Sequence, residues 1–171
     1  MRLVIVALLA LVTTGWAVWL AAAPALVASG GTGPALWAAA LTYRAGAVVC
    51  HQRDARSFHV AGVRMPVCSR CTGLYAGAAL GVLAAVGWIA ARRRAAVRLR
   101  LPPIERLRWG MVGAAVPTAL AWAAERLAGM AVPGGARALA AVPLGAAVGA
   151  LAALWAGGAP VGDTGTGSAL H

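Results

Sequence analysis

The sequence predicts an all-α, polytopic transmembrane helical bundle of four to five hydrophobic helices with a short polar Cys/His loop. Apolar residues make up 61% of the chain, against about 45–50% in an average soluble domain. Uncharged runs long enough to cross a bilayer alternate with segments that hold most of the charge. We therefore expect a single transmembrane helical domain over residues 1–157. A Gly/Thr/Ser-rich tail over residues 158–171 has little apolar surface to bury and is expected to be flexible.

The net charge of +11 comes from 15 basic residues against four acidic ones. A nucleic-acid-binding protein would carry such charge on a solvated module with stacking aromatic residues. Here the basic residues lie between apolar runs, so we expect no nucleic-acid partner. The expected partners are the lipid bilayer and, for the basic loop at residues 92–108, anionic lipid headgroups.

The first uncharged run extends from residue 3 to residue 23. At about 1.5 Å per residue it covers roughly the 30 Å hydrocarbon core, so it is expected to span the membrane. The alternative is a cleaved signal peptide, with Arg2 as its positive region and Ala21 to Ala23 as the cleavage site. The run is longer than the usual core of about 7–15 residues in such a peptide. Pro24 and the glycines that follow predict a turn.

Further helices are expected at residues 35–49, 72–91, 109–132 and 138–156, with turn residues between them. The helix at 35–49 is short and contains Arg44, so it either spans the membrane or is re-entrant. In the helix at 72–91, Gly73, Gly77 and Gly81 lie four residues apart and line one face. This spacing predicts close packing against another helix, and the same face is a candidate contact for a homo-oligomer or a membrane partner.

The orientation follows from the arginines. Seven of them crowd residues 92–108, the strongest positive-inside signal in the chain. We therefore expect a multi-pass protein of the cell membrane with this loop in the cytoplasm and the Cys/His loop on the extracytoplasmic side. The Cys/His loop carries a weaker signal of the same sign, from Arg53, Arg56, Arg64 and Arg70. Four or five spans, and either side for the N-terminus, remain open.

The polar stretch from Cys50 to Cys71, read as a loop, holds the chemically reactive residues. Cys50, Cys68 and Cys71 offer three sulfur ligands, and His51 or His59 offers a nitrogen. A Cys₃His set is a known composition for tetrahedral zinc, and sulfur ligands also suit copper or iron. We therefore predict a metal site at the membrane surface, with zinc as the default ion.

Two other interpretations fit the same segment. Cys68 and Cys71 begin a helix beside Arg70, an environment that stabilises a thiolate and favours thiol–disulfide exchange. The chain would then be a membrane redox protein using its Cys-x-x-Cys pair. Alternatively, the cysteines are inert packing residues, and the protein is a structural or assembly subunit without catalysis.

The segment from residue 50 to residue 77 resembles the signature of the membrane-protein family catalogued as domain of unknown function 2085. The residues that carry the resemblance are Cys50-His51-Gln52, Arg56-Ser57-Phe58, Gly62, Pro66-Val67-Cys68, Arg70-Cys71-Thr72-Gly73, Tyr75 and Gly77. The resemblance implies that Cys50, His51, Cys68 and Cys71 form one site, with His51 preferred to His59.

The same resemblance implies that Gln52, Arg56 and Arg70 act together as supporting residues. Arg56 and Arg70 would offset the charge of three thiolates or bind an anionic group. The resemblance brings no established activity, and no catalytic set is evident in the sequence. The sequence therefore does not decide whether the protein is an enzyme, and we favour a role other than catalysis.

Overall fold

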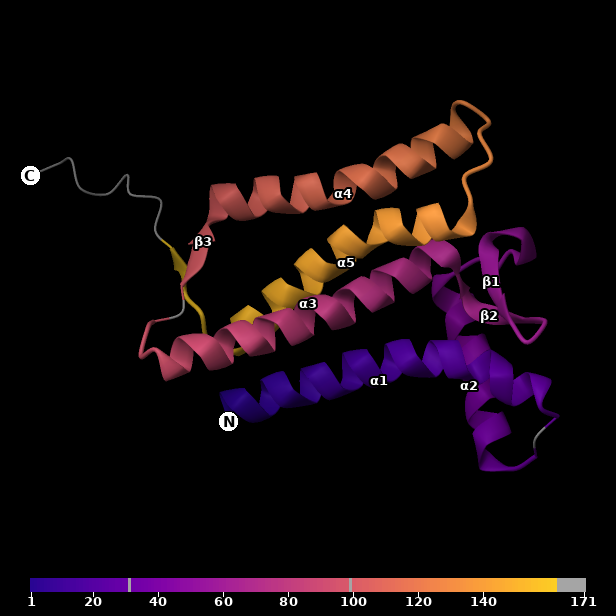
Figure 1. The fold of residues 1–171 in the computed structure, drawn as a ribbon, viewed down its shortest axis with the longest axis horizontal. Helices are drawn as coiled ribbons and strands as arrows, with labels where there is room; N and C mark the ends of the chain where they lie inside the picture. The colour runs from indigo at the N-terminus through magenta and orange to yellow at the C-terminus, as the bar shows by residue number, and fades with distance from the viewer. Residues whose placement is uncertain (31, 99, 163–171) are drawn as a thin grey trace, which may run out of the picture.

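The computed structural model describes residues 1–30, 32–98 and 100–162. Within these residues the chain is mainly helical, as predicted, and Figure 1 shows the helices lying side by side with short strands at the two ends of the bundle. The helices are α1 (Arg2–Ala28), α2 (Pro34–Val49), α3 (Ser69–Arg94), α4 (Ile104–Arg126) and α5 (Gly134–Ala156). A 3₁₀ turn, η1 (Asp54–Arg56), follows α2.

In the described part of the chain, α1, α3 and α5 are long and apolar enough to cross a membrane. Their outward faces carry exposed Leu, Val and Trp side chains, the surface expected of helices in contact with lipid. The helix α2 has only 16 residues, fewer than the roughly 20 that a span needs. The helix α4 is 23 residues long and has charged residues near both ends.

The helices α3 and α5 form the centre of the bundle and run parallel to each other (Figure 1). A Cβ atom placed on Gly73, Gly77 or Gly81 would overlap backbone atoms of Ala138, Val142 or Ala146, respectively. Each glycine of α3 and its partner in α5 differ by the same number of residues, so the two backbones are in contact on successive helical turns. The predicted close helix packing is confirmed. Because α5 of the same chain covers this glycine face, the face is not available to a second copy.

The remaining helices surround this pair. The helix α1 packs against α3, α4 packs against α5, and α2 bends away from the end of α1 (Figure 1). The N-termini of α3 and α5 and the C-termini of α1 and α4 therefore lie at the same end of the bundle as α2. The site described below is built at this end.

Two helix ends differ from the sequence expectation. Pro24 does not end the first helix, which continues to Ala28 with Pro24 buried inside it. The helix α4 ends at Arg126 instead of near residue 132. Gly129 has a φ of +61°, and the N–H of Met130 donates to the carbonyl of Ala124, the pattern of a helix closed by a left-handed glycine.

The polar segment between Cys50 and Cys71, expected as a loop, also contains regular secondary structure. Strands β1 (Ser57–Val60) and β2 (Val63–Cys68) form an antiparallel hairpin. Its two-residue turn, Ala61 and Gly62, has positive φ at both positions, as a tight hairpin turn requires. The hairpin register pairs Ser57 with Cys68 and so fixes the start of α3.

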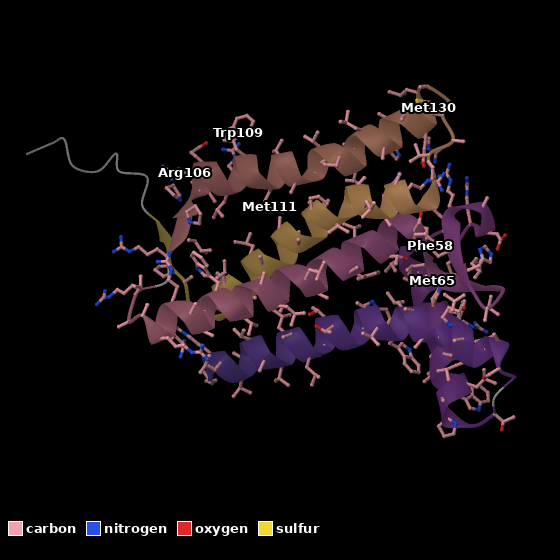
Figure 2. All side chains as sticks on the ribbon, viewed as in Figure 1. Phe58, Met65, Arg106, Trp109, Met111 and Met130 are labelled. Atoms are coloured by element: carbon pink, nitrogen blue, oxygen red, sulfur yellow. The ribbon has the colours of Figure 1, made fainter. Side chains whose placement is uncertain are left out.

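The segment between α3 and α4 lies at the opposite end of the bundle. Arg92, Arg93 and Arg94 form the last turn of α3, where positive charge is favoured by the helix dipole. Strands β3 (Leu101–Pro103) and β4 (Val161–Gly162), which the sequence did not predict, then pair in parallel. Figure 2 shows Arg106 at this end and Phe58 at the other. Of the tail expected to be flexible, residues 163–171 lie outside the described residues.

Candidate metal centre

The three cysteines meet at the hairpin end of the bundle. The Sγ atoms of Cys50, Cys68 and Cys71 all lie within 4.8 Å of one another, and all three residues are free thiols. Three sulfurs bound to one zinc ion at about 2.3 Å would be roughly 3.8 Å apart. Small side-chain movements would bring the sulfurs to that spacing, so the cluster has the dimensions of a metal site.

Local backbone structure accounts for this arrangement. Cys68 is the N-cap of α3 and Cys71 lies in its first turn, so the Cys-x-x-Cys spacing places both sulfurs at one helix end. Cys50 is the C-cap residue of α2. The backbone N–H of Cys68 donates to Cys50 Sγ at 3.2 Å, which holds the end of α2 against the start of α3.

An apolar cluster forms the floor beneath the sulfurs. Leu20, Met65 and Val67 are almost completely buried and pack with Cys50. Tyr75 packs against the same cluster, and its ring meets that of Trp16 edge-on at 6.1 Å. This cluster separates the thiols from the centre of the bundle, so water can reach them only from the opposite side.

The open side is a cavity of about 320 Å³, lined by residues from α2, α3, α4 and α5. All three cysteines and His51 line it. So do five arginines, namely Arg53, Arg56, Arg70, Arg126 and Arg137, together with a single acid, Glu125. The cavity therefore combines soft metal ligands with a strong excess of positive charge.

Glu125 anchors two of these arginines. Its side chain is only 4% exposed, and it forms ion pairs with Arg70 at 3.4 Å and with Arg137 Nε. Neither Glu125 nor Arg137 was among the site residues expected from the sequence. An acid directly after the uncharged stretch at residues 109–124 was nevertheless a usable signal, because charge next to a membrane-spanning stretch is costly and commonly functional.

Gln52 supports the site by holding backbone segments together. Its Nε2 donates to the carbonyls of Tyr43 at 2.7 Å and Pro66 at 2.8 Å. The Arg64 guanidinium donates to the Gln52 carbonyl in return. Gln52 thus links α2 to β2, and it does so with a positive φ of 43°. In this arrangement its amide hydrogens are occupied within the protein.

The two candidate histidines lie in different surroundings. His51 lines the cavity, although neither of its nitrogens belongs to the compact sulfur group. His59 lies on β1, where its Nε2 is 3.0 Å from the Asp54 carboxylate on the exposed side of the hairpin. Among the residues described, the structure brings together the three cysteines, and of the two histidines only His51 shares their cavity.

Hydrogen bonds favour the thiolate form of Cys68. The Cys71 side chain, helped by the Cys71 backbone N–H and against the opposing effect of burial, lowers the pKa of Cys68 to about 5. In metal-free protein we therefore expect iodoacetamide to modify Cys68 readily at pH 6 to 7 and to slow only as the pH falls through about 5. An ordinary cysteine would slow below about pH 8.5.

Peptide mass mapping of alkylated samples between pH 4 and pH 9 checks this expectation. The Cys68 peptide of a Cys50→Ser variant serves as a comparison, because Cys50 contributes only a minor part of the effect. Alkylation of Cys68 that falls off near pH 8 to 9, like that of an unperturbed thiol, would contradict the expectation.

Comparison with known proteins identifies a family for this chain, but the family and the relatives named below have no described activity. A family model described as "Predicted membrane protein (DUF2085)" matches residues 50–151. An uncharacterized protein of Methanocaldococcus jannaschii is 42% identical over 41 residues, 24% of this chain and 26% of that protein. An uncharacterized protein of Methanothermobacter thermautotrophicus is 53% identical over 30 residues, 18% of this chain and 27% of that protein. The aligned segments thus cover about a quarter of these relatives. No solved structure matches.

Proposed function

This chain belongs to the predicted membrane-protein family of domain of unknown function 2085, and from that premise we propose that it is a metal-binding membrane protein. Cys50, Cys68 and Cys71 provide three thiolate ligands, and the sulfur cluster is the observation that carries the proposal. Zinc is the expected ion, since three thiolates and one nitrogen or oxygen complete its tetrahedral shell. The proposed unit is one helical domain over residues 1–157.

His51 is the proposed fourth ligand. It follows Cys50 directly and lines the same cavity, so a rotation of its side chain is the simplest route to the ion. His59 would first have to leave Asp54 and is the less favoured alternative. With His51 bound the site is closed, as in structural zinc sites, whereas with water in the fourth position it is open, as in catalytic sites.

Metal analysis of purified protein tests the proposal. We expect about one zinc ion per chain in the wild type and almost none in a Cys68→Ser/Cys71→Ser variant, because two of the four ligands are lost. A His59→Ala variant is the matched control and should keep its metal. Metal-free wild-type protein, purified without chelators and after growth in zinc-supplemented medium, would refute the proposal.

Thiol–disulfide exchange is the second candidate, favoured by the adjacent sulfurs and the lowered pKa of Cys68. The Cys68 thiolate would attack a disulfide in a partner protein and release one partner thiolate. The Cys71 thiolate would then displace the second, leaving a Cys68–Cys71 disulfide and a reduced partner. Metal-free protein with a pair of thiols that is reversibly oxidised would favour this candidate.

We also propose that the cysteine cluster faces the extracytoplasmic side and that residues 92–108 face the cytoplasm. The seven arginines of that segment support the proposal through the positive-inside rule. In intact cells treated with a membrane-impermeant chelator, an impermeant maleimide should then label the cysteines. Labelling that occurs only after lysis would reverse the orientation.

A further inference from the structure

We propose that the arginine-lined cavity beside the cysteines binds a phosphate-type oxyanion, with Ser69 and Arg70 as its principal donors. The inference rests on the proposed function only in that the anion would share a cavity with the metal. Its donors, Ser69 and Arg70, are separate from the three sulfur ligands. The phosphoryl group could belong to a lipid headgroup or to a soluble phosphate, and the chemistry of recognition is the same for both.

Charge is the first argument. The cavity is lined by five arginines and one carboxylate, which leaves four positive charges. A divalent ion on three thiolates would remove only one of them. The cavity therefore stays strongly positive with the metal bound, and an anion is the natural counter-charge in a partly enclosed site.

Two residues that line the cavity, Ser69 and Arg70, each carry a buried donor without a partner in the part of the chain that the structure describes. Ser69 is completely buried, and its Oγ has no hydrogen-bond partner among the described residues. Arg70 Nε is also buried and without such a partner, although the terminal nitrogen of the same side chain is paired with Glu125. Buried polar groups in native proteins are nearly always hydrogen-bonded, so these two donors point to a missing acceptor.

Two helix N-termini lie close together at this end of the bundle. Ser69 and Arg70 are the first residues of α3, and α5 begins at Gly134; neither helix has a side-chain cap. A Cβ atom placed on Gly134 would lie 3.8 Å from Ser69 Cβ, so the two starts are adjacent. Both helices therefore direct the positive ends of their dipoles toward the same region, and at α3 the Arg70 and Cys71 N–H groups are already directed at Cys68.

The arrangement of donors favours a tetrahedral anion. Ser69 and Arg70 line the cavity from α3, Arg137 lines it from α5, and Arg126 lines it from α4. A planar carboxylate can use one fork of such donors, whereas the several oxygens of a phosphate can accept from different sides. Exposed Trp122 and Val49 also line the cavity, so a lipid headgroup could enter with its chains outside.

Titration calorimetry tests the inference on purified protein whose metal content is measured in each sample. One arm uses inorganic phosphate, with acetate as the planar anion. The other arm uses six-carbon phosphatidylglycerol, with six-carbon phosphatidylcholine for comparison. We expect saturable binding in one arm, weakened about tenfold or more by Ser69→Ala and by Arg70→Lys. Arg106→Gln, an exposed change at the opposite end of the bundle, should have no such effect.

The two variants separate binding from folding. Ser69→Ala removes an unpartnered hydroxyl and should leave thermal stability unchanged, while Arg70→Lys keeps the charge but loses Nε. Binding of phosphate alone assigns the soluble source, and binding of phosphatidylglycerol alone assigns the lipid. No binding in either arm, or equal binding by wild type and both variants, overturns the inference. If the purified protein contains zinc but binds neither phosphate nor phosphatidylglycerol, only this inference is contradicted. If it binds the anion but contains no metal, only the proposed function is contradicted.

Discussion

Replacing Gly77 with alanine is expected to lower stability by about 1–3 kcal/mol or more, because the added methyl group overpacks the centre of the bundle. The new Cβ would overlap the carbonyl oxygen of Val142. That atom belongs to the α5 backbone, so it can move only if the two helices separate. The separation would also displace Ser69 from the start of α5. Unfolding by sodium dodecyl sulfate, followed by circular dichroism, measures the loss.

Gly87→Ala is the matched control for this change. Gly87 lies on the same helix, and nothing lies within 4 Å of a Cβ atom placed on it. Alanine has a better intrinsic helix propensity than glycine by about 1 kcal/mol, so this variant should be neutral or slightly more stable. Similar losses for the two variants would show that the glycines matter for some reason other than the contact between α3 and α5.

The second large effect is expected from Cys50→Ser. Loss of an outer-shell partner costs a metal site about 10–100-fold in affinity, and loss of a thiolate ligand should cost at least that much. His51→Ala should weaken binding less, since water can take the fourth position. His59→Ala should have no effect, because His59 is paired with Asp54 on the outside of the hairpin.

Competition with a chromogenic zinc chelator measures these affinities. The order expected for the dissociation constants is Cys50→Ser above His51→Ala, with His59→Ala equal to the wild type. If the zinc affinity of Cys50→Ser were unchanged, Cys50 would not be a ligand, and only Cys68 and Cys71 would bind the ion through sulfur. A loss in His59→Ala that exceeds the loss in His51→Ala would exchange the roles of the two histidines.

The helical architecture could be predicted because hydrophobic length is a strong signal. The uncharged runs at residues 3–23 and 72–91 lie inside α1 and α3, and the four-residue glycine spacing correctly indicated a close helix neighbour. That neighbour was not identified, although Gly145 and Gly149 of α5 have the same spacing and contact Leu74 and Ala78. Such pairing depends on tertiary packing, which local sequence patterns do not encode.

The hairpin was missed because its strands are short and its turn lacks a strong signal. Strand β1 has four residues, and Ala61 occupies a positive-φ position more typical of Asn, Asp or Gly. At the site, the cysteines follow from a compact motif in the sequence. Glu125 and Arg137 do not, since they reach the cavity only when α5 packs against α3 and α4 packs against α5.

The most direct test of the central claim is X-ray absorption spectroscopy at the zinc edge on purified wild-type protein. The proposal predicts one ion per chain, with three sulfur atoms at about 2.3 Å and one nitrogen or oxygen atom at about 2.0–2.1 Å. Three sulfurs would identify Cys50, Cys68 and Cys71, the cysteines of this chain. An ion bound only by nitrogen and oxygen, or no bound ion, would contradict the proposal.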